Sequence, residues 1–93
     1  MEIRYFIDPE TGSPHIYRHG VVEDDVEDVL RRPIEDRPGR EGSRVAVGRT
    51  ETGRYLRIIY VADPAPDSVF VITGYPLGWR ALRALRRRRR RKK

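Results

Sequence analysis

The chain has 93 residues, of which 38% are hydrophobic and 37% charged, so it is long enough for one small domain and too polar for a membrane protein. It contains no cysteine and two histidines, which excludes a disulfide framework and argues against a structural zinc site. The first residues lack the basic and then apolar pattern of a signal peptide, so we expect a cytoplasmic location.

The formal net charge of +6 is unevenly distributed along the chain. Residues 1–78 carry ten Arg and fourteen Asp or Glu, whereas residues 79–93 carry ten Arg or Lys and no acidic residue. The body is therefore acidic and the C-terminal segment is strongly basic. We expect a single domain over residues 1–85 and a polybasic tail over residues 86–93.

The N-terminal part of the chain predicts a strand and then a helix. Apolar and polar side chains alternate over residues 2–7, and residues 8–12 have the composition of a tight turn. Over residues 22–30 the valines and Leu30 follow helical spacing, the acidic residues suit a helix start, and Pro33 ends the helix. Residues 33–43 are rich in Pro, Gly and charge, which predicts a polar loop.

Three strand-like runs rich in Val, Ile, Tyr and Phe follow, at residues 44–50, 54–62 and 68–75. Their short connections predict an antiparallel meander. Trp79, Leu82 and Leu85 then recur at three-residue spacing and predict a final helix that becomes polybasic from Arg86. The predicted fold class is α+β, with an antiparallel sheet of the N-terminal strand and the meander, an amphipathic helix after the first strand and a basic C-terminal helix.

The two short turns of the meander predict which residues lie side by side. A three-residue loop closes the first hairpin, and the second turn is interpreted with Ala62 opposite Ser68. The predicted pairs are Arg49 with Tyr55, Val47 with Arg57, Arg57 with Thr73, and Tyr55 with Tyr75. One exposed face then displays a polar cluster of Arg49, Tyr55, Arg57, Thr73 and Tyr75. The other face is predicted to be the core and carries Leu56, Ile58, Tyr60, Phe70 and Ile72.

The polar cluster suits RNA chemistry. The guanidinium of an Arg donates two hydrogen bonds to a phosphate or stabilises a pentavalent phosphorane, and the ring of a Tyr stacks on a base or its hydroxyl orients a hydroxyl of the substrate. RNA cleavage by 2′-hydroxyl attack without a metal needs little beyond positioning and charge stabilisation. The alternative is an ordinary solvated strand face, because Arg and Tyr are common there and a one-residue register slip would scatter the cluster.

Two histidines precede the acidic helix. His15 and His19 bracket three residues, and either imidazole has the chemistry of an acid–base group near neutral pH. The alternative is that His19 packs or caps near the helix start while Gly20 makes a turn. The sequence contains no nucleophile triad, Walker loop, dinucleotide fingerprint or pair of catalytic carboxylates, so we expect no cofactor and no metal.

The tail from Arg86 to Lys93 consists of eight consecutive positive charges. Such a run binds polyanions through counterion release, which makes nucleic acid or the ribosome its natural target. The alternative is a disordered solubilising tail.

Several short motifs occur in an order and spacing similar to one known family. Phe6-Ile7-Asp8-Pro9 stands near the start, His19-Gly20-Val21 opens the acidic helix, and Val47-Gly48-Arg49-Thr50 is followed by Gly53-Arg54-Tyr55-Leu56-Arg57-Ile58-Ile59-Tyr60. Over about residues 5–75 the chain resembles the BrnT-type toxins, which belong to the RelE-like ribonuclease toxins. The resemblance implies a small antiparallel sheet flanked by helices that cleaves RNA and arrests translation, and a DNA-binding antitoxin that neutralises it.

The resemblance carries over to individual residues only in part. Arg49 and Arg57 match family positions on the sheet. The final strand departs from the family pattern, because Thr73-Gly74-Tyr75 stands where these toxins commonly have Ser-Ala-Arg. The Arg that the family directs at the phosphate is therefore replaced by Tyr75, which puts the ribonuclease activity in question.

The function predicted from the sequence is the toxin component of a type II toxin–antitoxin system, an endoribonuclease that works without a metal. The expected partners are RNA, including RNA on the ribosome, and a small DNA-binding antitoxin, with no membrane; the oligomeric state is open and includes a homodimer. The alternative is a non-catalytic RNA- or protein-binding module of the same fold. The candidate catalytic residues are Arg57, Arg49, Tyr75 and His19. The candidate RNA-binding residues are Tyr55, Thr73, Arg86, Arg87, Arg88, Arg89, Arg90 and Arg91.

Overall fold

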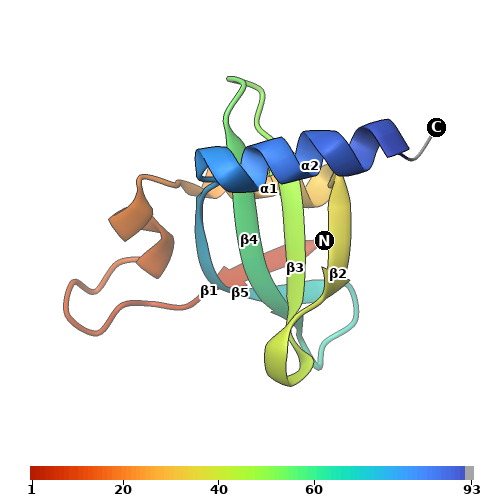
Figure 1. The fold of residues 1–93 in the computed structure, drawn as a ribbon. Coiled ribbons are helices and arrows are strands. Elements are labelled where there is room, and N and C mark those ends of the chain that lie inside the picture. The colour runs from red at the N-terminus through yellow and green to blue at the C-terminus, as the bar shows by residue number, and fades with distance from the viewer. Residues whose placement is uncertain (92–93) are drawn as a thin grey trace.

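The computed structural model describes residues 1–91 and has an α+β fold built on a single sheet (Figure 1). The strands are β1 (Glu2–Tyr5), β2 (Glu35–Pro38), β3 (Arg44–Arg49), β4 (Tyr55–Ala62) and β5 (Ser68–Pro76). The helices are α1 (Glu23–Arg31), α2 (Trp79–Arg91) and the short 3-10 helices η1 (His15–His19) and η2 (Arg40–Gly42). The sheet has five strands in the order β1-β5-β4-β3-β2, and the predicted meander β3-β4-β5 is confirmed as antiparallel. Within residues 1–91 no helix has the length and apolar character needed to span a membrane.

β1 lies at one edge of the sheet and runs parallel to β5, so the prediction of an antiparallel sheet is wrong for this strand. Residues 2–5 pair with residues 68–71 in parallel register. Alternation of apolar and polar side chains is the same for both directions of pairing, so the pattern of residues 2–7 contains no information about direction.

β2 lies at the opposite edge, within the segment predicted to be a polar loop. Residues 35–38 pair antiparallel with residues 44–47, and the Gly39 N–H donates to the Ser43 carbonyl at 2.8 Å to close the hairpin. An edge strand needs only backbone pairing on one side, and charged residues and proline are tolerated there. The loop prediction was therefore wrong because polar composition does not exclude an edge strand.

α1 covers one face of the sheet together with η1. Its first turn carries three acidic residues, which interact favourably with the helix dipole, and the Asp25 carboxylate accepts a hydrogen bond from the Val22 N–H at 3.0 Å. Val26 and Val29 are fully buried against the sheet. The core on this face consists of Ile16, Val21, Val26, Val29, Ala46, Leu56, Ile58, Tyr60 and Val71.

Two glycines allow the helical layer to approach the strands closely. A Cβ at Gly48 would lie 3.1 Å from Cγ1 of Val29 in α1, and a Cβ at Gly74 would lie 2.8 Å from Cδ1 of Ile58. The Gly74 position is also within 3.6 Å of Ile16 in η1. Gly74 therefore leaves room for the Ile58 side chain of β4, and Ile16 of η1 packs over it at ordinary contact distance.

Replacing Gly74 with alanine is expected to lower the free energy of unfolding by about 1–3 kcal/mol, because the new methyl group would overpack the core. Denaturant unfolding measures the change. The matched control is Gly78→Ala, because a Cβ at Gly78 meets nothing within 4 Å and the residue lies outside the core. Equal stability of the two variants would show that the core absorbs the methyl group.

The register at the β4–β5 turn explains why part of the predicted core is wrong. Ala62 pairs with Val69 and not with Ser68, so Tyr60 pairs with Val71; a β-bulge between Ile59 and Tyr60 then shifts the register by a second residue, so Arg57 pairs with Tyr75. The core position on β5 therefore belongs to Val71, and the predicted core residue Ile72 is 37% exposed. Because successive strand residues point to opposite faces, a shift of one residue exchanges the faces. Phe70 likewise lies off the core and stacks under the Arg4 guanidinium, with Cζ 5.7 Å from the ring centroid.

The predicted partners of the polar cluster are corrected by the same register. Arg57 pairs with Tyr75 and not with Thr73, and Thr73 pairs with Ile59. The difference from the predicted register is two residues at this end of the sheet, which preserves the face. Arg57, Thr73 and Tyr75 therefore share a face as predicted, although their order along the strands differs.

α2 crosses the opposite face of the sheet from α1 (Figure 1). Leu85 and Val47 are each 1% exposed, and the Arg88 guanidinium forms a bidentate ion pair with Glu35 at 2.7 and 2.8 Å. Glu35, Val47, Arg57 and Tyr75 pair in sequence across four strands and so lie in one row on this face. The face that was predicted to be exposed is thus partly covered by α2. Arg57 lies on this face and is half-buried.

Candidate functional site

Four rings and one guanidinium form a continuous series beside β5, which we term the ring row: Phe6, His15, His19, Tyr75 and Arg57. The ring centroids are 6.0 Å apart from Phe6 to His15, 5.5 Å from His15 to His19 and 5.8 Å from His19 to Tyr75. The Arg57 Cζ lies 5.9 Å from the Tyr75 ring centroid, within the range of a cation–π contact. Side chains from three distant parts of the sequence therefore converge.

The segment after β1 brings the histidines to this position. The Phe6 N–H donates to the Val71 carbonyl at 2.8 Å, and the His15 N–H donates to the Phe6 carbonyl at 2.9 Å. η1 then places His19 one turn after His15 and ends at Gly20, whose φ of 71° is in the left-handed region that favours glycine. Backbone hydrogen bonds to β5 thus fix the place of both imidazoles.

A shallow groove of about 520 Å³ follows the ring row. Its lining residues are Phe6, His15, His19, Ile72, Thr73 and Tyr75. Phe6 and Ile72 are 40% and 37% exposed, so the groove presents apolar surface to solvent beside the polar rings. A surface that combines flat rings, apolar area and one cation has the chemistry to bind a nucleotide base and its phosphate.

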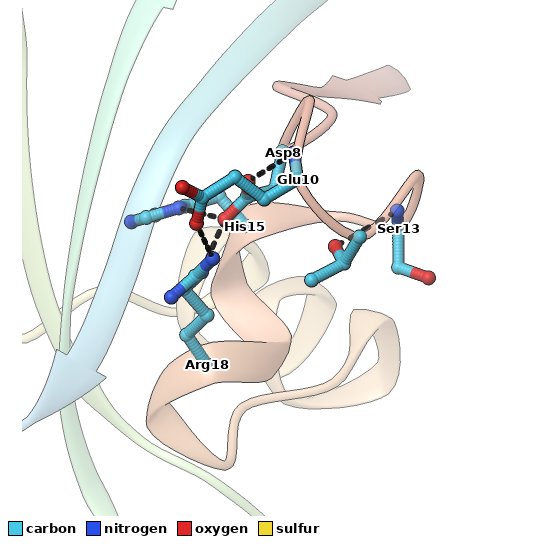
Figure 2. Close-up of polar contacts among 6 residues, drawn as sticks. Asp8, Glu10, Ser13, His15 and Arg18 are labelled. Carbon is cyan, nitrogen blue, oxygen red and sulfur yellow. Dashed lines mark hydrogen bonds and ion pairs between the residues drawn. The ribbon is translucent and has the colours of Figure 1, made fainter.

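The Asp8 carboxylate holds His15 in a defined orientation (Figure 2). Asp8 is 4% exposed; its carboxylate accepts hydrogen bonds from the Arg18 guanidinium, from the Glu10 N–H at 2.9 Å and from His15 Nδ1 at 3.2 Å. The bonds from Arg18, then from the Glu10 backbone and from His15, lower the pKa of Asp8 from 3.8 to about 2. An ionised carboxylate favours the proton on Nδ1 of His15, which leaves Nε2 free to accept a proton.

Two polar atoms near the groove are buried and, within residues 1–91, have no hydrogen-bond partner. They are Nε of Arg57 and Oγ1 of Thr73. A buried donor without a partner costs free energy, and such groups in native structures call for an explanation. Thr73 lines the groove, and Arg57 lies over Tyr75 at one end of the ring row.

The structure brings together four of the predicted site residues and places Arg49 and Tyr55 away from them. Arg57, Tyr75, His19 and Thr73 all lie at the ring row. Arg49 instead lies at the β3–β4 hairpin, within 4 Å of the Cβ position of Gly53. It lines a separate groove with Asp28, Arg31, Arg32, Thr50 and Glu51. The predicted pairing of Arg49 with Tyr55 is confirmed, which puts Tyr55 at the hairpin end of β4 as well.

The basic run at the C-terminus continues α2 as far as Arg91. Arg88 is engaged with Glu35, whereas Arg86, Arg87, Arg89 and Arg90 are exposed. Lys92 and Lys93 lie outside the described residues. The RNA-binding role predicted for this run stays a prediction.

Phe6 and Asp8 were not among the sequence candidates, and His15 was considered beside His19 as an acid–base group but was left out of the final candidates. Phe6 was assigned to the first strand, Asp8 was interpreted as a turn residue, and His15 was an alternative to His19 without a partner. The one sequence feature that indicates the Asp8–His15 contact is the tight turn at residues 11–12, which reverses the chain so that His15 meets Asp8. Composition identifies such a turn, but it does not show which side chains the turn brings together.

Loss of the Asp8 charge is expected to change the acid sensitivity of the fold. Because the folded-state pKa is lowered, the stabilisation is present above about pH 4 and is lost as the pH falls towards 2. The melting temperature of the native protein should therefore fall more steeply between pH 4 and 2 than that of Asp8→Asn. Glu10→Gln is the control, since Glu10 contacts Arg18 but not His15. If the melting temperatures of the native protein and of Asp8→Asn fell with the same slope between pH 4 and 2, the stabilising role assigned to the Asp8 carboxylate would be wrong.

Comparisons of the chain with family models, with curated proteins and with solved structures found no match. The resemblance to BrnT-type toxins therefore rests on the motifs quoted above. Among residues 1–91 no group of three or more His, Asp and Glu side chains is arranged to hold a metal ion.

Proposed function

We propose that the protein is an endoribonuclease that cleaves RNA by attack of the 2′-hydroxyl on the adjacent phosphate. The observation that carries the proposal is the ring row, in which an Asp-oriented histidine and a second histidine line one open groove, and an arginine lies over Tyr75 of the same lining. This set of groups can supply a base, an acid and a positive charge to a single phosphate.

In the proposed reaction Nε2 of His15 removes the proton from the 2′-hydroxyl of RNA. The O2′–P bond forms, and the guanidinium of Arg57 stabilises the charge of the phosphorane. The P–O5′ bond then breaks while protonated His19 gives a proton to O5′. The products are a 2′,3′-cyclic phosphate and a 5′-hydroxyl end, and no metal or cofactor takes part in this scheme.

Tyr75 has a supporting part in the proposal. A phenol is ordinarily neutral at pH 7, so it donates a hydrogen bond or stacks on a base but cannot neutralise a phosphorane. Charge stabilisation therefore falls mainly to Arg57. We expect cleavage of free RNA to be slow compared with a site that has two arginines at the phosphate.

The cellular role that we propose is that of a RelE-like toxin in a type II toxin–antitoxin system. This part rests on the resemblance of residues 5–75 to BrnT-type toxins. It includes an RNA substrate on the ribosome and neutralisation by a small DNA-binding antitoxin. A DNA-binding reading frame adjacent to the gene would support it, whereas an isolated gene would favour a binding module.

Two experiments test the proposal. Purified protein incubated with a single-stranded RNA in the presence of a chelator is expected to produce fragments with 2′,3′-cyclic phosphate ends. Induction of the gene in a bacterial host, with growth and RNA integrity followed over time, is expected to arrest growth as RNA is cleaved. Intact RNA in both experiments would contradict the enzymatic function.

The second candidate is a non-catalytic RNA-binding module. The ring row contains one guanidinium, and the exposed apolar residues of the groove, Phe6 and Ile72, suit contact with a base. Binding of a 2′-O-methyl RNA that the protein cannot cleave, together with no cleavage of ordinary RNA, would favour this candidate.

A further inference from the structure

α2 carries a second feature that the ring row does not use. Arg80, Arg83, Arg87 and Arg90 are separated by three, four and three residues, so they lie along one side of the helix, which we term the α2 stripe. All four are exposed. Leu85, which is buried, falls on the opposite side of the helix.

The orientation of the α2 stripe is fixed by the docking of the helix. Leu85 is 1% exposed, and Arg88 is tied to Glu35 of β2 by two hydrogen bonds. The ion pairs found within residues 1–91 engage Arg88 of this helix but none of the four stripe arginines. The stripe thus faces away from the sheet with its charges uncompensated by neighbouring carboxylates.

An exposed tryptophan lies at the start of the stripe. Trp79 is 62% exposed, and the Cζ atoms of Arg80 and Arg83 lie 5.2 and 5.6 Å from its ring centroid. Trp79, Arg80, Arg83 and Arg87 together line one surface depression. An indole beside guanidinium groups offers a stacking surface for a base next to contacts for phosphates.

We propose that Trp79 and the α2 stripe form a second RNA-binding surface, which holds the strand outside the ring row. The inference rests on the proposed function only in taking RNA as the partner. From Trp79 to Arg90 the helix extends about 16 Å, enough for several phosphates of a single strand. Each phosphate neutralised releases condensed counterions, which adds to affinity without reading the sequence.

The docking of α2 also favours RNA over a membrane surface. A helix that lies on a bilayer inserts its apolar face, and the apolar residue Leu85 of α2 is buried in the protein. The outward side presents arginines and one indole, which is the composition of a surface that binds a phosphate backbone.

The test uses the full chain, a 20-nucleotide 2′-O-methyl RNA and a dinucleotide substrate. The triple variant Arg80→Gln, Arg83→Gln and Arg87→Gln removes three charges, so the slope of log K against log salt is expected to become shallower by about 2. The native protein should then lose roughly 20-fold more affinity than the variant between 50 and 200 mM salt. Trp79→Ala should weaken binding at all salt concentrations.

The control variant Arg31→Gln, Arg32→Gln and Arg40→Gln removes the same number of exposed charges from other parts of the surface. Its salt slope is expected to stay near that of the native protein. An equal loss in both triple variants would show a net-charge effect and overturn the proposal. The proposal would also be overturned if the α2 triple variant lost binding to vesicles that contain anionic lipid while its RNA binding stayed equal to that of the native protein.

The two proposals fail in distinguishable ways. Cleavage of the dinucleotide, whose single phosphate is the one that reacts at the ring row, should be the same in the native protein and in the α2 triple variant. Shallower salt dependence without any cleavage would support the α2 surface and contradict the endoribonuclease. Cleavage of RNA together with an unchanged salt slope in the α2 triple variant would support the endoribonuclease and contradict the α2 surface.

Discussion

Replacing Arg57 with alanine is expected to lower the rate of RNA cleavage by about 10²–10³-fold, because the variant loses the charge that stabilises the phosphorane. Tyr75→Phe should lower the rate less, since it removes one hydrogen bond and leaves the charge in place. Both variants are measured against one RNA substrate at saturating concentration. The expected order is native, Tyr75→Phe and then Arg57→Ala.

Arg49→Ala is the matched control for this series. It removes the same side chain from the adjacent strand, but from the hairpin groove and not from the ring row. We expect near-native cleavage by this variant. Unchanged activity of Arg57→Ala would remove Arg57 from the site, and a larger effect of Tyr75→Phe would show that Tyr75 takes part in proton transfer.

Arg57→Ala should also remain folded. Nε of Arg57 is buried without a hydrogen-bond partner in residues 1–91, so truncation leaves no such partner unsatisfied. Circular dichroism and a melting curve separate a catalytic effect from unfolding. Arg57→Lys keeps the charge but not the planar fork, and it is expected to recover only part of the activity.

Replacing His15 with glutamine is expected to lower cleavage by about 10²–10⁴-fold, because the general base is removed. The native pH–rate profile should be bell-shaped. His15→Gln should lose the dependence at the acidic side, where the base must be deprotonated, and His19→Gln should lose it at the alkaline side. Loss of the same limb in both variants would contradict the division of roles.

The Asp8–His15 contact can be tested independently of activity. Nitrogen NMR of the native protein is expected to show the proton on Nδ1 of His15, and Asp8→Asn should mix the two tautomers. Tyr17→Phe is the control within η1, because Tyr17 is exposed and donates to Glu23 outside the groove. A native His15 protonated on Nε2 would contradict the proposed base.

Hairpin loop length was sufficient to predict the part of the site on β3 and β4. A three-residue loop leaves one favourable register, so the pairs of Arg49 with Tyr55 and of Val47 with Arg57 followed from the sequence. The loop between β4 and β5 is longer, and a bulge follows it. The cost of a bulge depends on packing against α1 and η1, which no local pattern contains. The partner of Arg57 was predicted wrongly because the register differs by one residue at the turn and by a second residue at the bulge.

Short-range periodicity by itself determined that the chain forms strands, an acidic helix and a basic helix, because those signals depend on neighbouring residues. Only the tertiary structure decided the side of the sheet that each helix covers and the direction of β1. It also decided the meeting of Asp8 with His15 and of His19 with Tyr75. These contacts join segments whose separation in the chain leaves no periodic trace. They form because the backbone hydrogen bonds of Phe6 to Val71 and of His15 to Phe6 place η1 beside β5.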